Sequence, residues 1–269
     1  MMARQVLWEN PPPDLAARAA RMVARHAGKS RRPKVFFRAD DIHEADPGFT
    51  RLARIFSARR APLSMAVVPA WITPEKVSGL LSVCKGAPDL WCFHQHGFDH
   101  ENRALSGKKA EFPDSRDQEA IRTDLARGRE RMEALFPERF DPVFTPPWNR
   151  LGEKGLVCLR ELGFSAVSRS FGSHPDPPPG LPDFPVQVDL HTRKETDPGQ
   201  AAAALFRELD EGLERGLCGI MIHHALMNDA AFDFLERLVG QVAGEESMEM
   251  LHLGDLAKRA SQPVSRGTL

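Results

Sequence analysis

The sequence carries almost no excess charge of either sign. Its 269 residues include 36 Lys and Arg against 37 Asp and Glu, which gives a formal net charge of -1. Proteins that bind nucleic acid or an anionic membrane usually present a cluster of basic side chains. We therefore expect no nucleic-acid partner.

Long apolar runs are also missing. Residues 1–28 contain no uninterrupted apolar stretch of the kind found in a signal peptide, and no segment approaches the ~20 apolar residues of a membrane span. We expect a cytoplasmic protein with no membrane span, and a homo-oligomer is left open. The four cysteines lack the C-x-x-C spacing of a zinc ribbon or redox pair, so we expect buried, reduced thiols at Cys84, Cys92, Cys158 and Cys218.

The sequence does contain an alternation of short β-prone runs with helix-length amphipathic segments. The β-prone runs are residues 34–39, 63–68, 90–93, 142–145, 166–168, 186–190 and 219–222. The amphipathic segments are residues 48–59, 75–84, 118–135, 153–162, 201–215 and 232–242. About seven β-α units predict an α/β fold with a barrel of parallel strands. An open doubly wound sheet is the alternative, but no G-x-G-x-x-G follows the first run.

We expect one barrel domain over residues 34–260, with an N-terminal helical extension at 1–33 and a C-terminal tail at 261–269. Two polar stretches with proline and glycine, residues 101–116 and 172–182, interrupt the alternation. They are predicted as surface loops, and loops at strand ends often shape a substrate pocket.

Polar side chains follow several of the predicted strands. Residues 92–100 read CFHQHGFDH and place three of the ten histidines where a strand ends: His94, His96 and His100. Other strand ends carry Asp40-Asp41, the turn TPPWN at residues 145–149, Asp189, and His223-His224. In a parallel barrel all of these positions gather at one rim. A shared site at that rim is therefore expected.

Each motif also has a simpler explanation when it is taken alone. The pair Asp40-Asp41 could cap a turn or a helix, and His223 could be a satisfied histidine at a strand end. The two prolines could merely fix the backbone direction, and Trp148 could equally be an aromatic cap on the core. Together these explanations require five coincidences at strand ends of the same polarity, which favours the shared site.

Five motifs, taken in their order along the chain, resemble those of the polysaccharide deacetylases, the carbohydrate esterase 4-like family. They are RADDI, HGFDH, TPPWN, VDL and MIH. That family has an Asp-Asp pair after the first strand, an H-x-x-x-H segment, a proline-rich turn before an aromatic residue, a later aspartate, and L-x-H near the last strand. The resemblance spans roughly residues 34 to 260 and implies a distorted (β/α) barrel. It also implies hydrolysis of an acyl group from an amine.

The resemblance implies a divalent metal bound by Asp41, His96 and His100. Two imidazoles and one carboxylate leave an open position, as in catalytic zinc sites, although Co, Fe and Ni accept the same ligands. We expect zinc. On a strand, His94 shares a face with His96 and is the alternative ligand if His96 points away.

The resemblance further implies catalytic roles for four residues. Asp40 is the expected general base and His223 the general acid, with Asp189 holding the other nitrogen of His223. The backbone N–H of Trp148 is expected to stabilise the developing oxyanion. The expected substrate-binding residues are Pro147, Trp148, Asn149, Arg150 and His224.

Several positions depart from the family pattern. Thr145 stands where the family has an arginine that pairs with the base, and Arg150 or Arg38 could replace it. Gly97 occupies a position that usually holds a hydroxyl residue, and His224 one that usually holds aspartate. The aspartate-tryptophan that normally follows the fourth motif is absent.

We expect an enzyme that hydrolyses C-N bonds other than peptide bonds in a saccharide or small amide substrate. Two alternatives stay open: a related C-N hydrolase acting on ureides or formamides, and a non-catalytic ligand-binding protein on the same scaffold. Because residues 223 and 224 point to opposite sides of a strand, only one of them can readily face the barrel axis.

Overall fold

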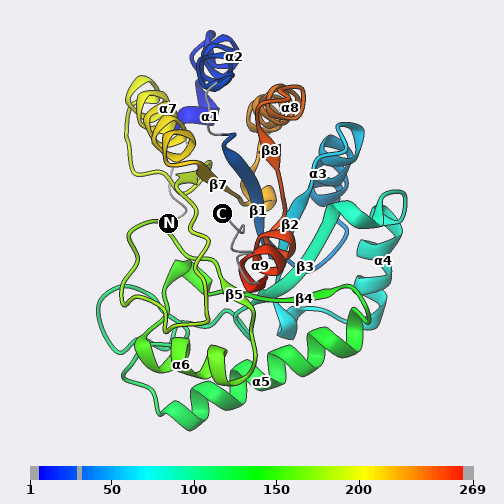
Figure 1. Cartoon of the computed structure of the whole chain (residues 1–269), viewed down its shortest axis with the longest axis vertical. Coiled ribbons are helices and arrows are strands. Elements are labelled where there is room, and N and C mark those ends of the chain that lie inside the picture. The colour runs from blue at the N-terminus through cyan, green and yellow to red at the C-terminus, as the bar shows by residue number, and fades with distance from the viewer. Residues whose placement is uncertain (1–5, 29–31, 263–269) are drawn as a thin grey trace, which may run out of the picture.

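The computed structural model describes residues 6–28 and 32–262. Within them, parallel strands form one curled sheet that is surrounded by helices (Figure 1). The strands are β1 (Lys34–Ile42), β2 (Leu63–Val67), β3 (Trp91–His96), β4 (Phe140–Thr145), β5 (Ala166–Val167), β6 (Val188–Asp189), β7 (Leu217–Ile222) and β8 (Glu249–Met250). The predicted α/β barrel is confirmed.

The helices follow the strands in the expected alternation. They are α1 (Val6–Glu9), α2 (Leu15–His26), α3 (Pro47–Ala58), α4 (Pro74–Cys84), α5 (Gln118–Leu135), α6 (Glu153–Glu161), α7 (Pro198–Arg215), α8 (Asp229–Ala243) and α9 (Leu253–Ser261). Four short 3₁₀ turns are η1 (Pro69–Trp71), η2 (Pro88–Leu90), η3 (Pro147–Asn149) and η4 (His224–Leu226). None of the helices in the described part of the chain is long and apolar enough to span a membrane.

The sheet has the strand order β5-β4-β3-β2-β1-β7-β6, and β8 pairs with the start of β1. Irregular backbone joins its two ends. Phe184 N–H donates to Val167 O of β5 at 2.9 Å, and Gln187 N–H donates to Gly219 O of β7 at 2.9 Å. The barrel is distorted because this segment, rather than a full strand, completes the circuit.

Side-chain caps start many of the helices. Asp46 accepts a hydrogen bond from Phe49 N–H at 2.6 Å, and Pro47 occupies the first turn of α3. Asp197 caps α7 in the same way, and Asn228 caps α8. A cap of this type contributes roughly 0.5–2 kcal/mol and fixes where the chain turns from a strand end into a helix. The helix starts therefore delimit the loops that carry the polar motifs.

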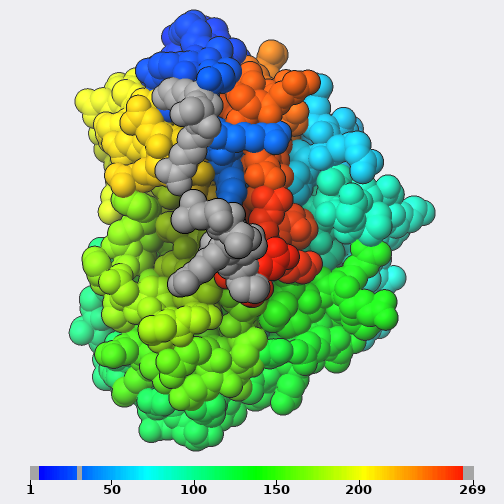
Figure 2. Space-filling view, in the orientation of Figure 1, coloured from blue at the N-terminus to red at the C-terminus, as the bar shows by residue number. Residues whose placement is uncertain are grey.

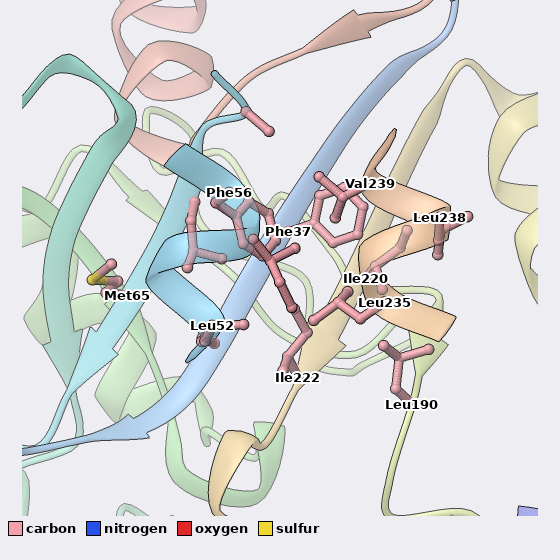
Figure 3. Close-up of a cluster of buried hydrophobic side chains, with 14 of the residues drawn as sticks. Phe37, Leu52, Phe56, Met65, Leu190, Ile220, Ile222, Leu235, Leu238 and Val239 are labelled. Atoms are coloured by element: carbon pink, nitrogen blue, oxygen red, sulfur yellow. The ribbon is translucent and has the colours of Figure 1, made fainter. Parts of the chain in front are cut away.

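The main core lies between the sheet and the helices outside it. Figure 3 shows Phe37, Ile220 and Ile222 of β1 and β7 beside side chains of α3 and α8, which are Leu52, Phe56, Leu235, Leu238 and Val239. The rings of Phe37 and Phe56 meet edge to face with centroids 5.3 Å apart. Because alternate residues of a strand face opposite sides, Arg38 and Asp40 then point into the barrel.

A second apolar cluster fills the barrel interior. It joins residues of β1, β3, β4 and β7 to α9, and includes Phe36, Cys92, Val143, Met221, Leu253 and Leu256. Leu253 N–H also donates to the buried Ser64 Oγ at 2.9 Å. The helix α9, which the sequence analysis did not predict, thus covers the end of the barrel where the strands begin.

The described part of the predicted N-terminal extension consists of α1 and α2, which pack against α7 and α8 at the top of Figure 1. Trp8 is buried and its Nε1–H donates to Leu190 O at 2.6 Å. The predicted tail at 261–269 lies almost wholly outside the described residues.

Candidate active site and metal centre

The polar motifs meet in one hollow of about 690 Å³ at the carboxyl ends of the strands. Its lining includes Asp40, Asp41, His96, His100, Trp148, Asn149, Arg150, Asp189 and His223. These residues come from β1, β3, β6, the end of β7 and the loops that follow β3 and β4. The structure therefore brings together nine of the predicted site residues.

Asp41, His96 and His100 converge on one point. Oδ1 of Asp41 lies 3.2 Å from Nε2 of His96 and 3.3 Å from Nε2 of His100. His96 is 2% exposed. Burial alone would raise the pKa of Asp41, but the hydrogen bond from His96 and the nearby imidazoles lower it well below its usual value. The carboxylate is therefore ionised at neutral pH.

The backbone around these ligands takes unusual conformations. Asp41 and His100 have φ of 63° and 60°, in the left-handed region that residues other than glycine rarely adopt. Gly97 has φ of 62°, and a Cβ there would lie 2.1 Å from Glu111 Oε2 and 2.6 Å from Pro147 Cγ. This close approach explains why glycine replaces the hydroxyl residue expected at position 97.

The tautomer of His96 is fixed by the neighbouring strand. Its Nδ1 lies 3.0 Å from Thr145 O, which can only accept, so Nδ1 carries the proton. Nε2 faces Asp41 and would offer its lone pair to a metal bound between them. Two imidazole nitrogens and one carboxylate oxygen within 4.8 Å of one another fit a divalent metal of the zinc type.

Asp40 is held by Arg38. The guanidinium is completely buried, and its Nε and Nη2 donate to Oδ1 and Oδ2 of Asp40, both at 2.8 Å. Burial would raise the pKa of Asp40, but Arg38, together with His96 and His223, lowers it below its usual value. Of the two arginines considered as a replacement for the family's arginine, Arg38 is therefore the one that pairs with Asp40.

The remaining donors of Arg38 connect the base to the proline turn. Its Nη2 donates to Asn149 Oδ1 at 2.6 Å, and its Nη1 donates to Ser168 Oγ at 2.8 Å. Arg150 points elsewhere and donates to Lys109 O at 2.8 Å. Asn149, expected to bind substrate, thus also orients the arginine that pairs with Asp40.

His94 stands behind the three converging residues. It is completely buried, and its Nε2 lies 2.9 Å from Thr145 Oγ1. Burial and the charge of Arg38 lower its pKa to about 3, so the ring is neutral. Thr145 thus contacts two histidines, with its carbonyl on His96 and its hydroxyl on His94.

His223 lines the hollow, but the expected hydrogen bond from Asp189 is not present. The Asp189 carboxylate instead accepts from His191 N–H at 2.8 Å, from Thr192 N–H at 2.9 Å and from the Thr192 hydroxyl. The buried Nδ1 of His223 has no partner among the described residues. Asp189 caps a local turn because the chain turns sharply after β6.

His224, expected among the substrate-binding residues, is turned away from the hollow. It is 3% exposed, and its Nε2 lies 3.7 Å from Asp46 Oδ2 at the start of α3. Its ring packs on Phe49 with centroids 6.1 Å apart. Alternation along the chain thus aims His223 inward and His224 outward, as expected for adjacent residues.

Trp148 forms one wall of the hollow. It has a φ of 55° within η3, after the buried Pro147, and its ring lies 4.5 Å from the ring of His100. A second indole, Trp71, has its ring centroid 5.5 Å from that of His100 and is 37% exposed. Two tryptophans therefore lie beside the imidazole.

Three residues near the site were missed by sequence reasoning. Trp71 lies on a short turn after β2, Glu111 is completely buried below the loop that carries His100, and His191 contacts the backbone of His223. Glu111 Oε1 accepts from Phe98 N–H at 2.9 Å and from Asp99 N–H at 3.1 Å. A glutamate within a loop predicted to lie at the surface gave no sign of this burial.

Solved structures with the same fold include carbohydrate-active proteins. A protein from Mycobacterium smegmatis assigned as a polysaccharide deacetylase matches with a TM-score of 0.65 and 18% identity, over 90% of this chain and 96% of that one. A family 4 acetyl xylan esterase from Clostridium thermocellum, in complex with a cobalt ion, matches with a TM-score of 0.56 and 10% identity, over 86% and 93%.

A third match is a CE4 family pseudoenzyme from Bacillus anthracis, with a TM-score of 0.54 and 12% identity over 85% of this chain and 66% of that one. No family model matches the sequence, and no curated protein matches it. The chain thus shares the fold of the polysaccharide deacetylases and CE4 esterases. At this level of identity the likeness concerns the fold alone.

Proposed function

We propose that the protein is a metal-dependent hydrolase that removes an acyl group, in the first place acetyl, from an amine of a saccharide or small amide. The observation that carries this proposal is the convergence of Asp41, His96 and His100 beside an aspartate held by a buried arginine. A divalent ion bound there, zinc in the first place, would supply a Lewis acid that acidifies water and polarises a carbonyl. The cobalt-bound esterase of the same fold supports a metal at such a site.

Asp40 would act as the general base. Its two oxygens accept from Arg38, which keeps the carboxylate ionised and fixes its plane. It is adjacent to Asp41, so it can take a proton from water that attacks a carbonyl held at the ligand cluster. Because each carboxylate oxygen has further lone pairs, the bidentate pairing leaves Asp40 able to accept that proton.

His223 would donate a proton to the leaving amine. It lines the same hollow as Asp40 and Asp41, and His191 Nδ1 lies 3.4 Å from its backbone N–H. The N–H of Trp148, held in the left-handed turn, would donate to the developing oxyanion. The indoles of Trp148 and Trp71 offer faces on which a sugar ring can stack.

One specific observation favours a second function, a ligand-binding protein without turnover. The Nδ1 of His223 has no partner within residues 6–28 and 32–262, so no carboxylate of this part of the chain orients the proposed general acid. One structural neighbour is itself a pseudoenzyme. A related C-N hydrolase that acts on ureides or formamides without a metal is the third candidate.

Elemental analysis combined with an activity panel separates these candidates. Protein purified without chelator would be analysed for metal, then assayed on acetylated amino sugars, acetylated small amides, formamides and cyclic ureides, before and after chelation. We expect bound metal and deacetylation that chelation abolishes. Activity that survives complete metal removal would refute the proposal in favour of the ureide or formamide hydrolase, and metal without turnover would favour the binding protein.

A further inference from the structure

A second group of metal-binding side chains lies at the other end of the barrel. Cys92 is on β3 four residues before His96, which places it about 13 Å away along the strand. Asp141 is near the start of β4, and His252 directly precedes α9. This group is therefore separate from the hollow that contains the candidate active site.

The three side chains converge as a ligand set does. One ligand atom from each, the Cys92 sulfur, an Asp141 oxygen and a His252 nitrogen, all lie within 4.8 Å of one another. Cys92 is completely buried and His252 is 6% exposed. Thiolate, imidazole and carboxylate are the ligand types that zinc uses. We propose that Cys92, Asp141 and His252 form a second binding site for a divalent transition metal, zinc in the first place.

The surroundings of this cluster favour a cation. A hollow of about 540 Å³ opens onto Asp141 and His252 and gives an entry path from the surface near α9, which is red in Figure 2. The hollow's acidic residues outnumber its Lys and Arg, since it contains Asp89, Glu138, Asp141 and Asp255 against Arg139 and Lys258. Oδ2 of Asp255 lies 3.5 Å from Nε2 of His252 and offers a fourth ligand. The field of these acids would concentrate cations there.

The backbone at the start of α9 lies close to the Asp141 side chain of this cluster. A Cβ on Gly254 would lie 2.4 Å from Asp141 Oδ1, so only glycine lets the start of α9 approach this carboxylate. Asp141 interacts with the Cys92 thiol and with Lys258, whose Nζ lies 3.5 Å from Oδ1 and whose side chain is 69% exposed. An exposed lysine can move aside when a metal takes its place.

Binding would end one hydrogen bond and release one proton. His252 Nδ1 now accepts the Asp255 N–H at 3.1 Å as the cap of α9, and a metal on either ring nitrogen ends that bond. The Asp255 N–H keeps an acceptor, because His252 O also lies 3.1 Å away. Burial and the Asp141 carboxylate hold the pKa of the Cys92 thiol well above its usual value, so the thiol must release its proton on binding. Metal affinity should therefore rise with pH.

The thiolate gives the test its selectivity. The metal-free protein would be titrated with Co²⁺ and followed by the near-ultraviolet thiolate-to-cobalt charge-transfer band, which a site of carboxylate and imidazoles cannot produce. We expect the band to report one bound equivalent, in addition to the equivalent that the proposed active site binds without a thiolate. Cys92→Ser should abolish it, whereas Cys218→Ser, which removes another fully buried thiol, should retain it. His100→Ala should also retain it, so failure of the proposed active site would leave this result unchanged.

The proposal is overturned if the wild-type protein shows no thiolate band at saturating Co²⁺, or if Cys92→Ser keeps the band. Should Cys92→Ser not fold, Asp141→Asn keeps the thiol and the fold of β4. We expect at least a ten-fold weaker Co²⁺ affinity for Asp141→Asn, and an unchanged affinity would also overturn the proposal.

Discussion

The two sides of the main hollow differ in how firmly their polar side chains are held. On the side of β1 and β3, Asp40 accepts two hydrogen bonds from Arg38, and Thr145 O fixes the His96 ring. On the side of β6 and β7, the Asp189 carboxylate accepts hydrogen bonds from its own turn, and His223 Nδ1 has no partner in the part of the chain that the structure describes. On the first side Asp40 and His96 lie within the long strands β1 and β3, whereas on the second side Asp189 ends the two-residue strand β6 and His223 follows the end of β7. The half with the proposed metal ligands and the proposed base is therefore preorganised to a degree that the half with the proposed acid is not.

The largest expected effect is on the firmly held side. Asp40→Asn should lower turnover by ~10²–10⁴-fold, because the amide cannot accept the proton, while metal content stays at the wild-type level. Steady-state kinetics and elemental analysis measure the two quantities. Asp41→Ala is the matched control and should lose the metal itself. Wild-type turnover in Asp40→Asn would show that Asp40 is not the general base.

The next largest effect is expected on the loosely held side, that of β6 and β7. His223→Ala should lower turnover by up to ~10²–10⁴-fold with metal binding intact, since a general acid is lost. His224→Ala should change kcat far less, because this ring packs against α3 outside the hollow. Asp189→Ala should also affect kcat less than His223→Ala does. If His224→Ala were the inactive variant instead, the assignment of the acid would move by one residue.

The comparison can also be tested through stability. Arg38→Met should destabilise the fold by about 3–5 kcal/mol, because it leaves Asp40 charged, buried and without its partner. Arg150→Met, whose guanidinium makes one bond to Lys109 O near the surface, should cost no more than about 0.5 kcal/mol. Urea unfolding of both variants measures the difference. Equal costs would mean that the Arg38–Asp40 pair does not stiffen its side of the hollow.

Measured per pH unit, the smallest expected effect is the change in the free energy of unfolding that results from the titration of Glu111. Burial, the first cause, and the nearby Asp99 raise the pKa of Glu111 from 4.5 to about 8. The unfolded state releases this proton more readily than the folded state does. The contribution of protonated Glu111 to the free energy of unfolding is therefore complete below about pH 4.5 and is lost as pH rises toward 8. The slope cannot exceed about 1.4 kcal/mol per pH unit. Glu111→Gln should flatten the wild-type loss of stability across this window, and an unchanged slope would contradict the buried, protonated acid.

The features that depend on the strands could be predicted from local sequence patterns. Arg38 and Asp40 are two residues apart, so a strand places them on one face, and the same alternation separates His223 from His224. The parallel barrel follows from the spacing of the β-prone runs, and it gathers the strand-end residues in one hollow. Neither inference requires knowledge of distant contacts.

The features that the sequence did not predict depend on irregular backbone or on contacts between residues far apart in the sequence. The Asp189 carboxylate turned to its own loop because residues 191 and 192 present two free N–H groups to it. Glu111 became buried because the loop after β3 folds back over Gly97. The helix α9 packs into the barrel although its sequence is short and mixed. Local periodicity encodes neither the turn at Asp189 nor the burial of Glu111, whereas α9 does have a helical apolar pattern in Leu253, Leu256 and Ala257 that is easily overlooked in a nine-residue segment.

The pairing of Arg38 with Asp40 within one strand has a consequence for motion. Two side chains that leave the same face of β1 stay together when a loop opens, whereas a partner on the proline turn would leave with that turn. Local opening of residues 146–150 would therefore expose the hollow to solvent without releasing the base from its cation. Substrate could enter by that route while the charge state of Asp40 is maintained throughout the opening and closing cycle.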